Sequence, residues 1–460
     1  MSLSLASREI QGHTPMLGAS RSPFAVTETV PQIVVALECD RPLAGASRHS
    51  LAHIDTVLLG RGTARRASRA QDSRELRLEV PDAWLSADHA RLVRREGQWW
   101  IADALSTNGT RVNGRPCAEA CLRDGDVIQA GRTLFWFRHA AAQDGDLLDA
   151  IPGLATVAPS MCAALEALPR IARSSLPVVV VGESGTGKEL VARAIHALSL
   201  RSGPFQAVNC AALPMTLLES ELFGARKGAF SGAAEDRPGL VRAADRGTLL
   251  LDEVADLAAP AQAALLRFLQ ESEVLPVGAT RPIRVDVRVV AAAQADLRSL
   301  VAEGRFRADL FARLDAFTVR LPPLRERRED IGLLVAALLR KLAPERCEEL
   351  RISPEAALAL FRHSWPLNVR ELEHSLAVAL TVGRDTTIEA DHLPEGIRVG
   401  RSELVPGGDG DRDRFREELL ALLQRYRGNV AEVARAFGKG RMQIHRWARR
   451  YDIDLASFRR

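Results

Sequence analysis

Apolar residues in the first third of the chain come in short runs separated by polar residues and turn formers. Runs of this kind, some alternating with polar positions, are typical of strands in an antiparallel sandwich. The pattern predicts a β-sandwich over residues 32–140, whereas residues 1–31 are polar and aperiodic and receive no element. The strands are expected at residues 33–37, 57–59, 76–80, 99–101 and 134–137.

A different pattern begins after the polar stretch at residues 143–146. From residue 151, apolar runs that suit buried strands alternate with segments of helical periodicity, which predicts a doubly wound parallel sheet. Residues 331–388 have helical periodicity without a strong strand signal and are expected to form a helical lid. The α/β unit with its lid is predicted to span residues 151–397, with strands at residues 177–181, 205–209, 248–252 and 287–292.

The C-terminal part of the chain has a third pattern. Residues 398–413 are rich in glycine, a composition typical of a flexible linker. Residues 414–460 are predicted to form three short helices, an all-α unit. The net charge of +4 is modest, but from Lys439 to Arg460 seven Lys and Arg residues stand against two aspartates. This asymmetry indicates an anionic partner for the C-terminus. Three folded units fit a chain of 460 residues.

The expected strand at residues 177–181 is followed by a glycine-rich segment and then by an amphipathic helix. In this order, backbone N–H groups of the loop turn toward a phosphate and the helix N-terminus adds partial positive charge. A lysine at the end of the loop reaches the terminal phosphates. A tight turn without a ligand is the structural alternative. The segment predicts an ATP-binding site formed by Gly182, Glu183, Ser184, Gly185, Thr186, Gly187, Lys188 and Glu189.

A second motif supports nucleotide chemistry. The apolar run at residues 248–251 ends in Asp252 and Glu253. In phosphoryl transfer one carboxylate holds Mg²⁺ and another orients the attacking water, so we assign Asp252 to the metal and Glu253 to the water. The two motifs together predict a nucleotide hydrolase that uses ATP and Mg²⁺. Glu189 departs from the pattern, because a Ser or Thr hydroxyl usually meets the magnesium ion there.

With these motifs in view, the segment at residues 221–233 resembles the AAA+ ATPase domain of bacterial enhancer-binding proteins, the activators of sigma-54 RNA polymerase. The resemblance covers about residues 151–397 and implies ATP hydrolysis in a homo-oligomer, expected to be a hexamer. It also implies a mobile loop that contacts sigma-54, although the family usually has Thr where this chain has Ser231. A buried turn with a core Phe is the alternative. The expected contact residues are Gly228, Ala229, Phe230, Ser231, Gly232 and Ala233.

The same resemblance assigns roles to four further residues. Asn209 matches the asparagine that holds the catalytic glutamate, here Glu253. Arg307 and Arg313 match arginines offered to the nucleotide of the neighbouring subunit, and Arg370 matches the lid arginine that senses the γ-phosphate. Ordinary surface salt bridges are the alternative for Arg307 and Arg313. The expected catalytic set is therefore Asp252, Glu253, Asn209, Arg307 and Arg313.

One departure from the family lies at the end of the strand at residues 287–292. The family usually has Thr followed by Asn or His, whereas this chain has Ala293 and Gln294. The amide of Gln294 can replace a side-chain amide, but Ala293 cannot replace a hydroxyl. We expect retuned or reduced turnover and not its loss, because Lys188 and the two carboxylates remain.

The N-terminal sandwich carries three polar segments in order, at residues 60–61, 86–89 and 106–114. This order resembles the forkhead-associated (FHA) domain, which binds phosphothreonine peptides. The resemblance implies a partner that is a phosphothreonine-containing protein or a phosphorylated segment of this chain. His89 would brace the loops, and Ala87 stands where the family often has Asn; a phosphate-blind docking sandwich is the alternative. The expected phosphothreonine-binding residues are Arg61, Ser86, Thr107 and Asn108.

Residues 414–460 resemble a Fis-type helix-turn-helix. Asn429 would cap one helix, Gly438 would close it, and residues 441–451 would form the recognition helix. Gly440 stands where a capping Ser is common. A basic helical tail without DNA contact is the alternative. The side chains expected to reach base edges or phosphates of enhancer DNA are Arg441, Gln443, His445 and Arg446.

The remaining features to consider are the cysteines and any signal for membrane insertion or secretion. Its six cysteines are scattered without the His or Cys pairs of a metal site, so we expect reduced structural thiols. No apolar run has the length of a membrane span, and the N-terminus lacks the order of a secretion signal. These features predict a cytoplasmic protein without a membrane partner.

The motifs together predict a sigma-54-dependent transcriptional regulator that binds upstream DNA and uses ATP hydrolysis to remodel the closed promoter complex. Phosphothreonine recognition by the FHA domain is expected to control it. Two alternatives remain at this point. One is a DNA-bound regulator that binds nucleotide without useful turnover. The other is a phosphopeptide-reading scaffold that does not engage sigma-54.

Overall fold

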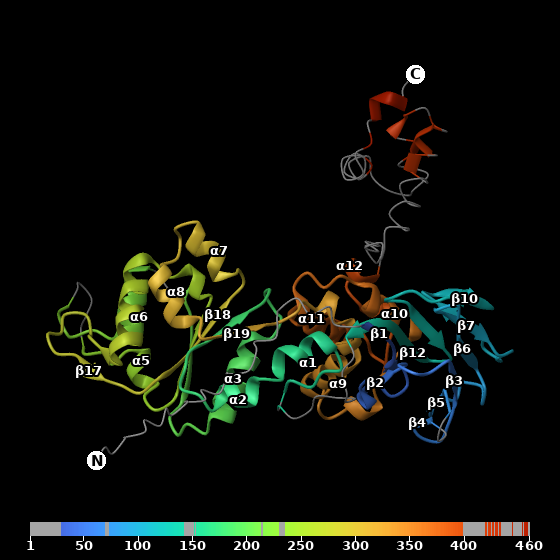
Figure 1. Ribbon diagram of the computed structural model, residues 1–460, viewed down its shortest axis with the longest axis horizontal. Helices are drawn as coiled ribbons and strands as arrows, with labels where there is room; N and C mark the ends of the chain where they lie inside the picture. The colour runs from blue at the N-terminus through green and yellow to red at the C-terminus, as the bar shows by residue number, and fades with distance from the viewer. Residues whose placement is uncertain are drawn as a thin grey trace, which may run out of the picture.

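The N-terminal part of the chain is a sandwich of two six-stranded sheets (Figure 1). The computed structural model describes residues 29–69, 73–141, 151, 153–212, 215–229 and 235–398, with scattered positions between 419 and 458. The strands of the first sheet are β1 (Thr29–Glu38), β2 (Ser47–Ser50), β8 (Thr110–Val112), β9 (Arg115–Cys117), β11 (Val127–Ala130) and β12 (Thr133–Ala141). Their order is β2-β1-β12-β11-β8-β9.

The second sheet has the order β10-β7-β6-β3-β5-β4. Its strands are β3 (Thr56–Arg61), β4 (Arg66–Arg69), β5 (Glu75–Val80), β6 (Ala90–Arg95), β7 (Gln98–Asp103) and β10 (Glu119–Cys121). Neighbouring strands are antiparallel except for the parallel pair β3 and β5. All five strand positions expected from the sequence are strands here, which confirms the predicted sandwich.

The first sheet is apolar on both of its faces. Ile33 and Val35 of β1 point into the core between the two sheets, together with Phe135 of β12. The alternate residues Val34 and Ala36 point the other way and are equally buried. A sheet with two apolar faces has to be covered on both sides. Another part of the chain must therefore pack against its outer face.

The central part of the chain is built on a five-stranded parallel sheet. Its strands are β13 (Val178–Val181), β14 (Phe205–Asn209), β15 (Thr248–Asp252), β18 (Arg288–Ala293) and β19 (Phe317–Arg320). The order is β14-β15-β18-β13-β19. The sequence predicted four of these strands. It missed β19, an edge strand of four residues whose Thr318 and Arg320 interrupt the apolar pattern.

Helices cover both faces of this sheet. In β13, Val178 and Val180 contribute to one core, whereas Val179 and Val181 contribute to the core on the opposite face. The predicted doubly wound architecture is confirmed. The helices of this unit are α1 (Pro159–Leu165), α2 (Leu168–Ala172), α3 (Lys188–Ser199), α4 (Met215–Phe223), α5 (Leu240–Ala243), α6 (Ala259–Glu271), α7 (Leu297–Ala302) and α8 (Ala308–Leu314), and a small hairpin joins β16 (Glu273–Val274) to β17 (Ile283–Arg284).

The segment after β19 is the predicted helical lid. It contains α9 (Ile331–Leu342), α10 (Pro354–Arg362), α11 (Asn368–Val382) and α12 (Glu395–Arg398). The structure adds one detail, because β20 (Arg351–Ile352) and β21 (Thr387–Ile388) form a short parallel ladder in a segment without a strong strand signal. Each strand has only two residues, too few for an alternating pattern to be visible in the sequence.

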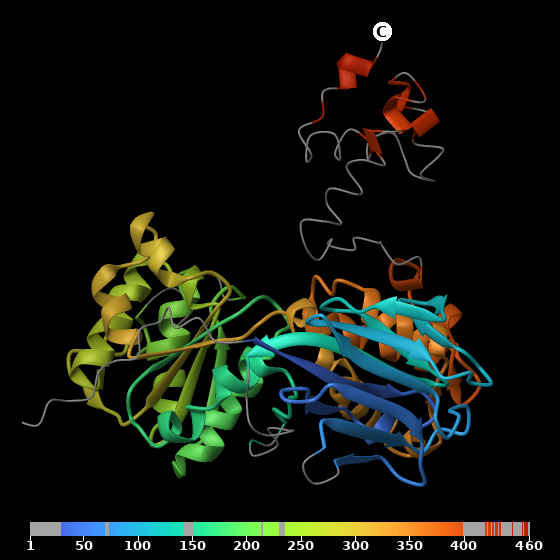
Figure 2. The same ribbon diagram turned by 45° about the vertical axis from the view of Figure 1, so that its right-hand side comes forward.

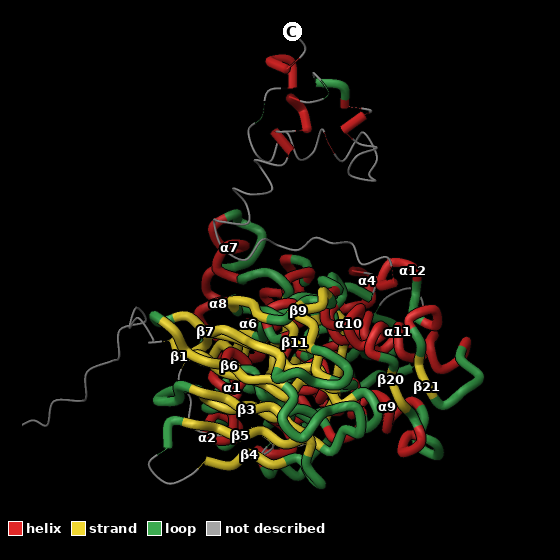
Figure 3. The backbone as a smooth tube through the Cα atoms, turned by 90° about the vertical axis from the view of Figure 1, so that its right-hand side faces the viewer, coloured by secondary structure: helices red, strands yellow, loops and turns green. Residues whose placement is uncertain are grey.

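The lid covers the outer face of the first sheet of the sandwich. Figure 2 shows the blue and cyan strands against the orange helices, and Figure 3 shows the same contact along the long axis. Val34 and Ala36 of β1 share one buried core with Val335 of α9. The rings of Trp136 in β12 and Phe361 in α10 have centroids 6.0 Å apart. Sandwich and lid therefore have a common hydrophobic core, which the sequence analysis did not anticipate.

Charged side chains close one edge of this interface. Arg138 of β12 forms a 2.6 Å ion pair with Glu329, which lies just before α9 and is almost fully buried. The next residue, Asp330, is fully buried and accepts hydrogen bonds from the Thr156 hydroxyl at 2.7 Å and from the backbone N–H of Val157 at 2.8 Å. The sandwich, the start of the central unit and the entry to the lid thus meet at one point.

The predicted all-α C-terminal unit is only sparsely described. A small apolar cluster formed by Leu419, Leu423, Val430, Val433 and Ile444 is present. The side-chain oxygen of Asn429 accepts a hydrogen bond from the backbone N–H of Glu432 at 3.4 Å, as expected of a helix cap. The predicted DNA-binding residues Arg441, Gln443, His445 and Arg446 lie outside the described residues. Across the described parts of the chain, no helix has the length and apolar character of a membrane span.

Candidate functional site

The glycine-rich segment connects the C-terminal end of β13 to the N-terminus of α3, where the sequence placed it. Gly185 and Gly187 have φ angles of 77° and 105°, which favour glycine over other residues. Gly187 immediately precedes Lys188, the first residue of α3. The loop therefore curls over a helix N-terminus, an arrangement suited to an anionic phosphate group.

Lys188 is buried beneath this loop, with 7% of its surface exposed. Its ammonium group donates to the carbonyl oxygen of Gly182 at 3.0 Å and lies 3.5 Å from the Oε1 atom of Glu253. A buried ammonium needs such partners because desolvation disfavours its charge. The two motifs identified in the sequence are thus brought together around one lysine.

Asp252 and Glu253 stand at the C-terminal end of β15, beside the loop. Glu253 has a φ of 54°, an uncommon conformation for a residue other than glycine. Burial raises the pKa of the Asp252 carboxyl, and the neighbouring Glu253 carboxylate raises it further. Two carboxylates in a partly buried site attract a divalent cation, which would relieve their mutual repulsion. The donors present therefore fit Mg²⁺.

The departure at Glu189 has a structural counterpart. Glu189 lies on the exposed face of α3 and pairs with Arg193 at 2.7 Å. The loop does contain a buried hydroxyl one turn earlier, on Thr186, but this group donates to the carbonyl oxygen of Glu183 at 2.8 Å. Position 189 thus contributes an exposed carboxylate to the rim of the site and no hydroxyl.

Two side-chain amides flank Glu253 from opposite sides. Asn209, at the end of β14, uses its side-chain oxygen to accept hydrogen bonds from the N–H groups of Ala211 and Ala212 at 2.9 and 3.1 Å. Gln294, directly after β18, donates from Nε2 to the Oε1 atom of Glu253 at 2.9 Å. The expected contact between Asn209 and Glu253 is absent from the described hydrogen bonds, and Gln294 makes it instead.

The lid lies directly on the phosphate loop. Arg370 donates to the hydroxyl of Ser184 at 2.7 Å, and the N–H of Val369 donates to the carbonyl oxygen of Gly185 at 3.0 Å. A side chain at position 185 would collide with the carbonyl group of Leu367. The predicted lid arginine is therefore at the nucleotide loop, and a glycine is required where loop and lid touch.

Two further arginines tie the loop in place, and the sequence analysis did not assign them. Arg325 forms a two-pronged ion pair with Glu183, at 2.7 and 2.6 Å. The hydrogen bonds from Arg325 lower the pKa of the Glu183 carboxyl. Buried Arg327 donates to the carbonyl oxygen of Thr186 at 2.9 Å. Both arginines lie in the charged run after β19, a signal that could have indicated a partner of opposite charge in the loop.

Arg307 and Arg313 are on the outer surface, at α8. Arg307 pairs with its neighbour Asp309 at 2.7 Å, and Arg313 donates to the carbonyl oxygen of Leu269 at 3.2 Å. Neither makes a described contact with the phosphate loop or with Asp252 and Glu253. Both arginines are exposed, and their described partners belong to their own domain.

The expected sigma-54 contact segment is described only at its base. Gly228 and Ala229 are included, whereas Phe230, Ser231, Gly232 and Ala233 lie outside the described residues. Below them the two arms of the segment meet at a β-bridge between Ala225 and Arg237. Arg226 and Asp236 form an ion pair at 2.5 Å across the same arms. The two ends of the segment are thus held together where it leaves the domain.

Three loops at one end of the sandwich bring together the predicted phosphothreonine-binding residues. The N–H of Arg61, the last residue of β3, donates to the carbonyl oxygen of Ser86 at 2.9 Å. The hydroxyl of Ser86 accepts from the N–H of Thr107 at 3.2 Å. Asn108 donates to the carbonyl oxygen of Trp84 at 2.8 Å. The side chains of Arg61, Thr107 and Asn108 are exposed, so a ligand can reach them.

Buried polar groups support these loops from below. His89 is fully buried, and its Nδ1 atom accepts from the N–H of Ser86 at 3.1 Å. Burial lowers the pKa of His89, which favours the neutral ring that this acceptor role requires. Asp103, which the sequence analysis did not assign, accepts from the hydroxyls of Ser106 and Thr110 at 2.6 Å each. Its position just before the Ser-Thr-Asn-Gly segment was the available signal.

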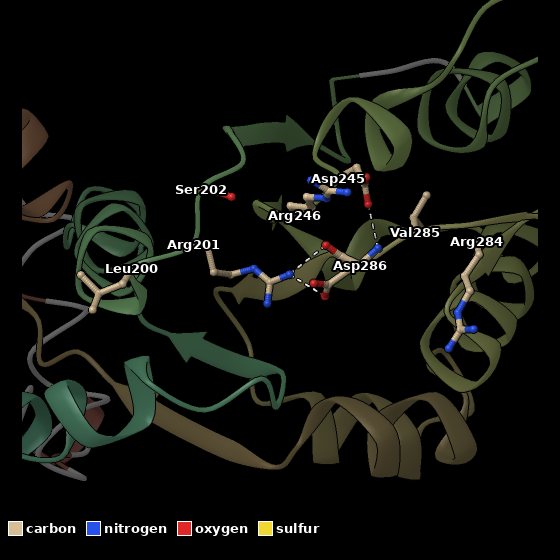
Figure 4. Close-up of a pocket in the computed structure, with 8 residues that line it drawn as sticks. All are labelled: Leu200, Arg201, Ser202, Asp245, Arg246, Arg284, Val285 and Asp286. Atoms are coloured by element: carbon tan, nitrogen blue, oxygen red, sulfur yellow. Dashed lines mark hydrogen bonds and ion pairs between the residues drawn. The ribbon is translucent and has the colours of Figure 1, made fainter.

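A hollow lies at the opposite edge of the central sheet, between α3 and the starts of β14, β15 and β18 (Figure 4). Arg201 spans it and pairs with Asp286 at 2.5 Å, and Asp245 accepts from the N–H of Asp286 at 2.8 Å. Arg201, Asp245 and Asp286 are thus bonded to one another within the hollow. The lining residues are Leu200, Arg201, Ser202, Asp245, Arg246, Arg284, Val285 and Asp286.

The cysteines and metal ligands of the described residues add no further site. All six cysteines are free. Within the described ranges, no group of three or more His, Cys, Asp or Glu side chains is arranged to hold a metal ion. The chemistry therefore concentrates at the phosphate loop and at the loops of the sandwich.

Comparison with known families assigns three parts of the chain. Residues 154–320 match the sigma-54 interaction domain, residues 325–407 match the AAA+ ATPase lid domain, and residues 57–131 match the FHA domain. The first two ranges cover the parallel sheet and the lid, and the third covers the sandwich from β3 to β11, without β1, β2 and β12. The resemblances to the sigma-54 AAA+ domain and to the FHA domain, both inferred from local motifs, are thus confirmed. The resemblance of residues 414–460 to a helix-turn-helix stays a prediction.

Individual relatives agree with these matches. The chain is 42% identical over 311 residues to the transcriptional regulatory protein GlrR of Escherichia coli K12, covering 66% of this chain and 69% of the relative. It is 42% identical over 316 residues to the regulatory protein AtoC of the same organism, covering 65% and 68%. Among solved structures, NtrX from Brucella abortus in complex with ADP matches with a TM-score of 0.50 and 35% identity, covering 64% of this chain and 68% of that one.

Proposed function

Because the chain belongs to the sigma-54-dependent transcriptional activators, the bacterial enhancer-binding proteins, and carries an AAA+ ATPase domain with a lid and an N-terminal FHA domain, we propose that it hydrolyses ATP in an oligomeric ring to remodel the closed complex of sigma-54 RNA polymerase. The observation that carries this proposal is the convergence of Lys188, Asp252 and Glu253 at the glycine loop. These groups are the minimum that in-line phosphoryl transfer requires.

Each residue has a distinct role in the proposed reaction. The loop N–H groups and Lys188 bind the phosphates of ATP. Asp252 would hold Mg²⁺, which supplies charge neutralisation at the β- and γ-phosphates when bound. Glu253 orients the attacking water and accepts its proton. Arg370 of the lid, 2.7 Å from Ser184, is close enough to the loop to respond to the γ-phosphate.

The active site is proposed to be shared between subunits. Arg307 and Arg313 make no described contact with the phosphate loop of their own chain and lie at the surface. An arginine that stabilises transition-state charge increases the rate by several orders of magnitude, and in some nucleotide hydrolases a second protein supplies it. A ring, expected to be a hexamer, would place these arginines at the neighbouring nucleotide.

The segment above the Ala225–Arg237 bridge is proposed to deliver the mechanical output. Phe230 supplies an apolar anchor for a groove on sigma-54, flanked by small residues that let the loop fit closely. Arg226 and Asp236 hold the two arms together at the base of the segment. A conformational change at the nucleotide site can therefore move Phe230 as one unit with the bridged base of the segment.

Control is proposed to enter through the FHA domain. Arg61 and Ser86 would bind the phosphate of a phosphothreonine, and Thr107 and Asn108 would support the peptide. The core shared by β1, β12 and the lid helices α9 and α10 connects this domain to the element that touches the phosphate loop. A phosphorylated partner, or a phosphorylated segment of this chain, would thereby influence the lid. The C-terminal residues Arg441, Gln443, His445 and Arg446 are proposed to hold the protein at upstream DNA.

One experiment tests the central claim. ATP turnover is measured as a function of protein concentration for the wild type and for Arg307→Ala. Turnover per subunit that rises cooperatively with concentration, and that is lost in the variant while ADP binding persists, supports a ring with shared sites. Turnover that is independent of concentration and unchanged in Arg307→Ala would contradict it.

A further inference from the structure

Two strand ends of the central sheet approach Glu253 from opposite sides. In β14, Asn209 is directly paired with Asp252, and in β18, Ala291 is paired with Leu251. Because the strands are parallel, their C-terminal ends lie along one edge of the sheet. An amide on either neighbouring strand end can therefore reach the carboxylate that follows Asp252.

Only one of these two amides contacts Glu253 in the described structure. The side-chain oxygen of Asn209 is engaged in a turn with the N–H groups of Ala211 and Ala212, a local arrangement that Asn favours. Gln294 instead donates from Nε2 to Glu253 Oε1 at 2.9 Å. The same oxygen lies 3.5 Å from the ammonium group of Lys188.

We propose that Gln294 is the residue that positions Glu253 for catalysis in this chain. Fully buried Ala293 has no side-chain donor, so the amide of Gln294 supplies the hydrogen bond at the end of β18. The long side chain of Gln294 starts from an exposed position and spans the edge of the sheet to Glu253. This role of Gln294 presupposes the ATPase activity proposed above, and it involves neither the FHA domain nor sigma-54.

The geometry gives this hydrogen bond a specific consequence. With Oε1 of Glu253 held by Gln294 and near Lys188, the other carboxylate oxygen remains to orient the attacking water. When ATP binds, Lys188 is drawn to its phosphates. Gln294 is then the donor that still fixes the orientation of Glu253. Turnover, and not nucleotide binding, should therefore depend on Gln294.

The test replaces the donor while preserving the shape of the side chain. Gln294→Met has the same length and no N–H group, and Gln294→His retains a donor. We expect Gln294→Met to lower kcat by roughly 10–100-fold, the range for removing a group that orients a functional ligand, with KM for ATP and ADP affinity within about twofold. Gln294→His should recover much of the loss. The matched control is Gln270→Met, an exposed glutamine on α6, which should leave all three values unchanged.

A double-mutant cycle with Glu253→Gln shows whether Gln294 acts through Glu253. If it does, Gln294→Met should cause no additional loss of turnover in the Glu253→Gln background. Asn209→Ala, measured in parallel, should cost less than Gln294→Met. The proposal is overturned if Gln294→Met keeps kcat within twofold of the wild type, if its loss persists in the Glu253→Gln background, or if Asn209→Ala costs as much.

Discussion

Gly332 of lid helix α9 lies directly against the backbone carbonyl of Ala36 in FHA strand β1, so closely that any side chain at position 332 would overlap it. The two residues belong to domains that are nearly 300 positions apart in the chain. Gly332 is buried in the core that the FHA domain shares with the lid. This contact is possible only because position 332 has no side chain, so adding one methyl group there, as in Gly332→Ala, tests it.

Gly332→Ala should destabilise the protein. In most helices this change is favourable, because alanine has the higher helix propensity by about 1 kcal/mol. At position 332 the added methyl group must displace the backbone of β1, and overpacking of this kind costs about 1–3 kcal/mol. Thermal unfolding should therefore move to lower temperature. Gly396→Ala is the matched control, since Gly396 lies in lid helix α12 with open space around it; a stabilised Gly332→Ala would contradict the tight docking.

The ion pair between Arg138 and Glu329 predicts a pH dependence of stability. Burial raises the pKa of Glu329 from 4.5 to about 7, although Arg138 partly opposes the shift. The folded protein therefore binds a proton at Glu329 more tightly than the unfolded chain does. The contribution of this residue to the free energy of unfolding should be fully present below pH 4.5 and should be lost as the pH rises toward 7.

Variants at this pair separate its effects. Glu329→Gln should abolish the part of the pH dependence that lies between pH 4.5 and 7, as measured by chemical denaturation across that range. Arg138→Met leaves a buried carboxylate without its partner, so it should destabilise the protein at pH 8 more than at pH 5. Removing one partner of a buried pair costs roughly 3–5 kcal/mol, and the partial exposure of Arg138 places the loss toward the lower end. An equal loss at both pH values would contradict this account.

The two-pronged contact between Arg325 and Glu183 predicts an effect on nucleotide binding. Arg325→Ala should leave the phosphate loop less firmly oriented and raise KM for ATP several-fold, with a smaller effect on kcat. ADP affinity, measured by calorimetry, should fall in parallel. The exchanged pair Arg325→Glu with Glu183→Arg should recover part of the affinity, and a fall in kcat at constant KM would argue against a loop-orienting role.

Phosphothreonine recognition predicts a large effect of Arg61. Arg61→Ala should abolish binding of a phosphothreonine peptide, because the exposed guanidinium group is expected to bind the phosphate oxygens. The matched control is Arg95→Ala, at the opposite end of β6, where Arg95 pairs with Glu119 at 2.6 Å. Fluorescence anisotropy with phosphorylated and unphosphorylated forms of the same peptides measures both. Equal affinity of the wild type for the two forms would show a phosphate-blind domain.

The apolar anchor predicts that ATP hydrolysis and promoter activation can be separated. Phe230→Ala should retain ATP turnover within about twofold, since no residue of the phosphate loop is changed, and should lose activation of a sigma-54 promoter in a purified transcription assay. Phe230→Tyr, which keeps the ring, should retain part of the activity. Full activation by Phe230→Ala would remove the anchor from the mechanism.

The sequence was most informative where a short motif fixes both the backbone and the chemistry. The glycine loop and the strand that ends in Asp252 were predicted at the positions where the structure has them, because glycines, strand and helix follow one another without interruption. The polar segments of the sandwich, which the structure places in neighbouring loops, were located in the same way. In each case a few adjacent residues determine the geometry of the site.

Contacts between distant segments could not be derived in this way. The pairing of Glu183 with Arg325 joins residues of two separate motifs, and neither motif reveals the other. The contact of Gln294 with Glu253 depends on which of two amides a turn leaves free. One signal of the shared core was present, since residues 33–37 are uninterruptedly apolar, as in a strand buried on both faces. The sequence could not identify which element covers the second face.

The common core of FHA domain and lid also changes how the modular boundaries of this chain should be drawn. Cutting the chain between residues 141 and 151 would not separate a free-standing FHA domain from an intact ATPase domain. It would expose Phe361 of the lid, whose ring packs against Trp136, together with the outer face of β1. If a truncated protein aggregates or loses ATPase activity, the cause would therefore be the exposed core of the lid and not the loss of an activating domain. In this chain the smallest unit with an intact core is the sandwich together with the lid helices that pack against it.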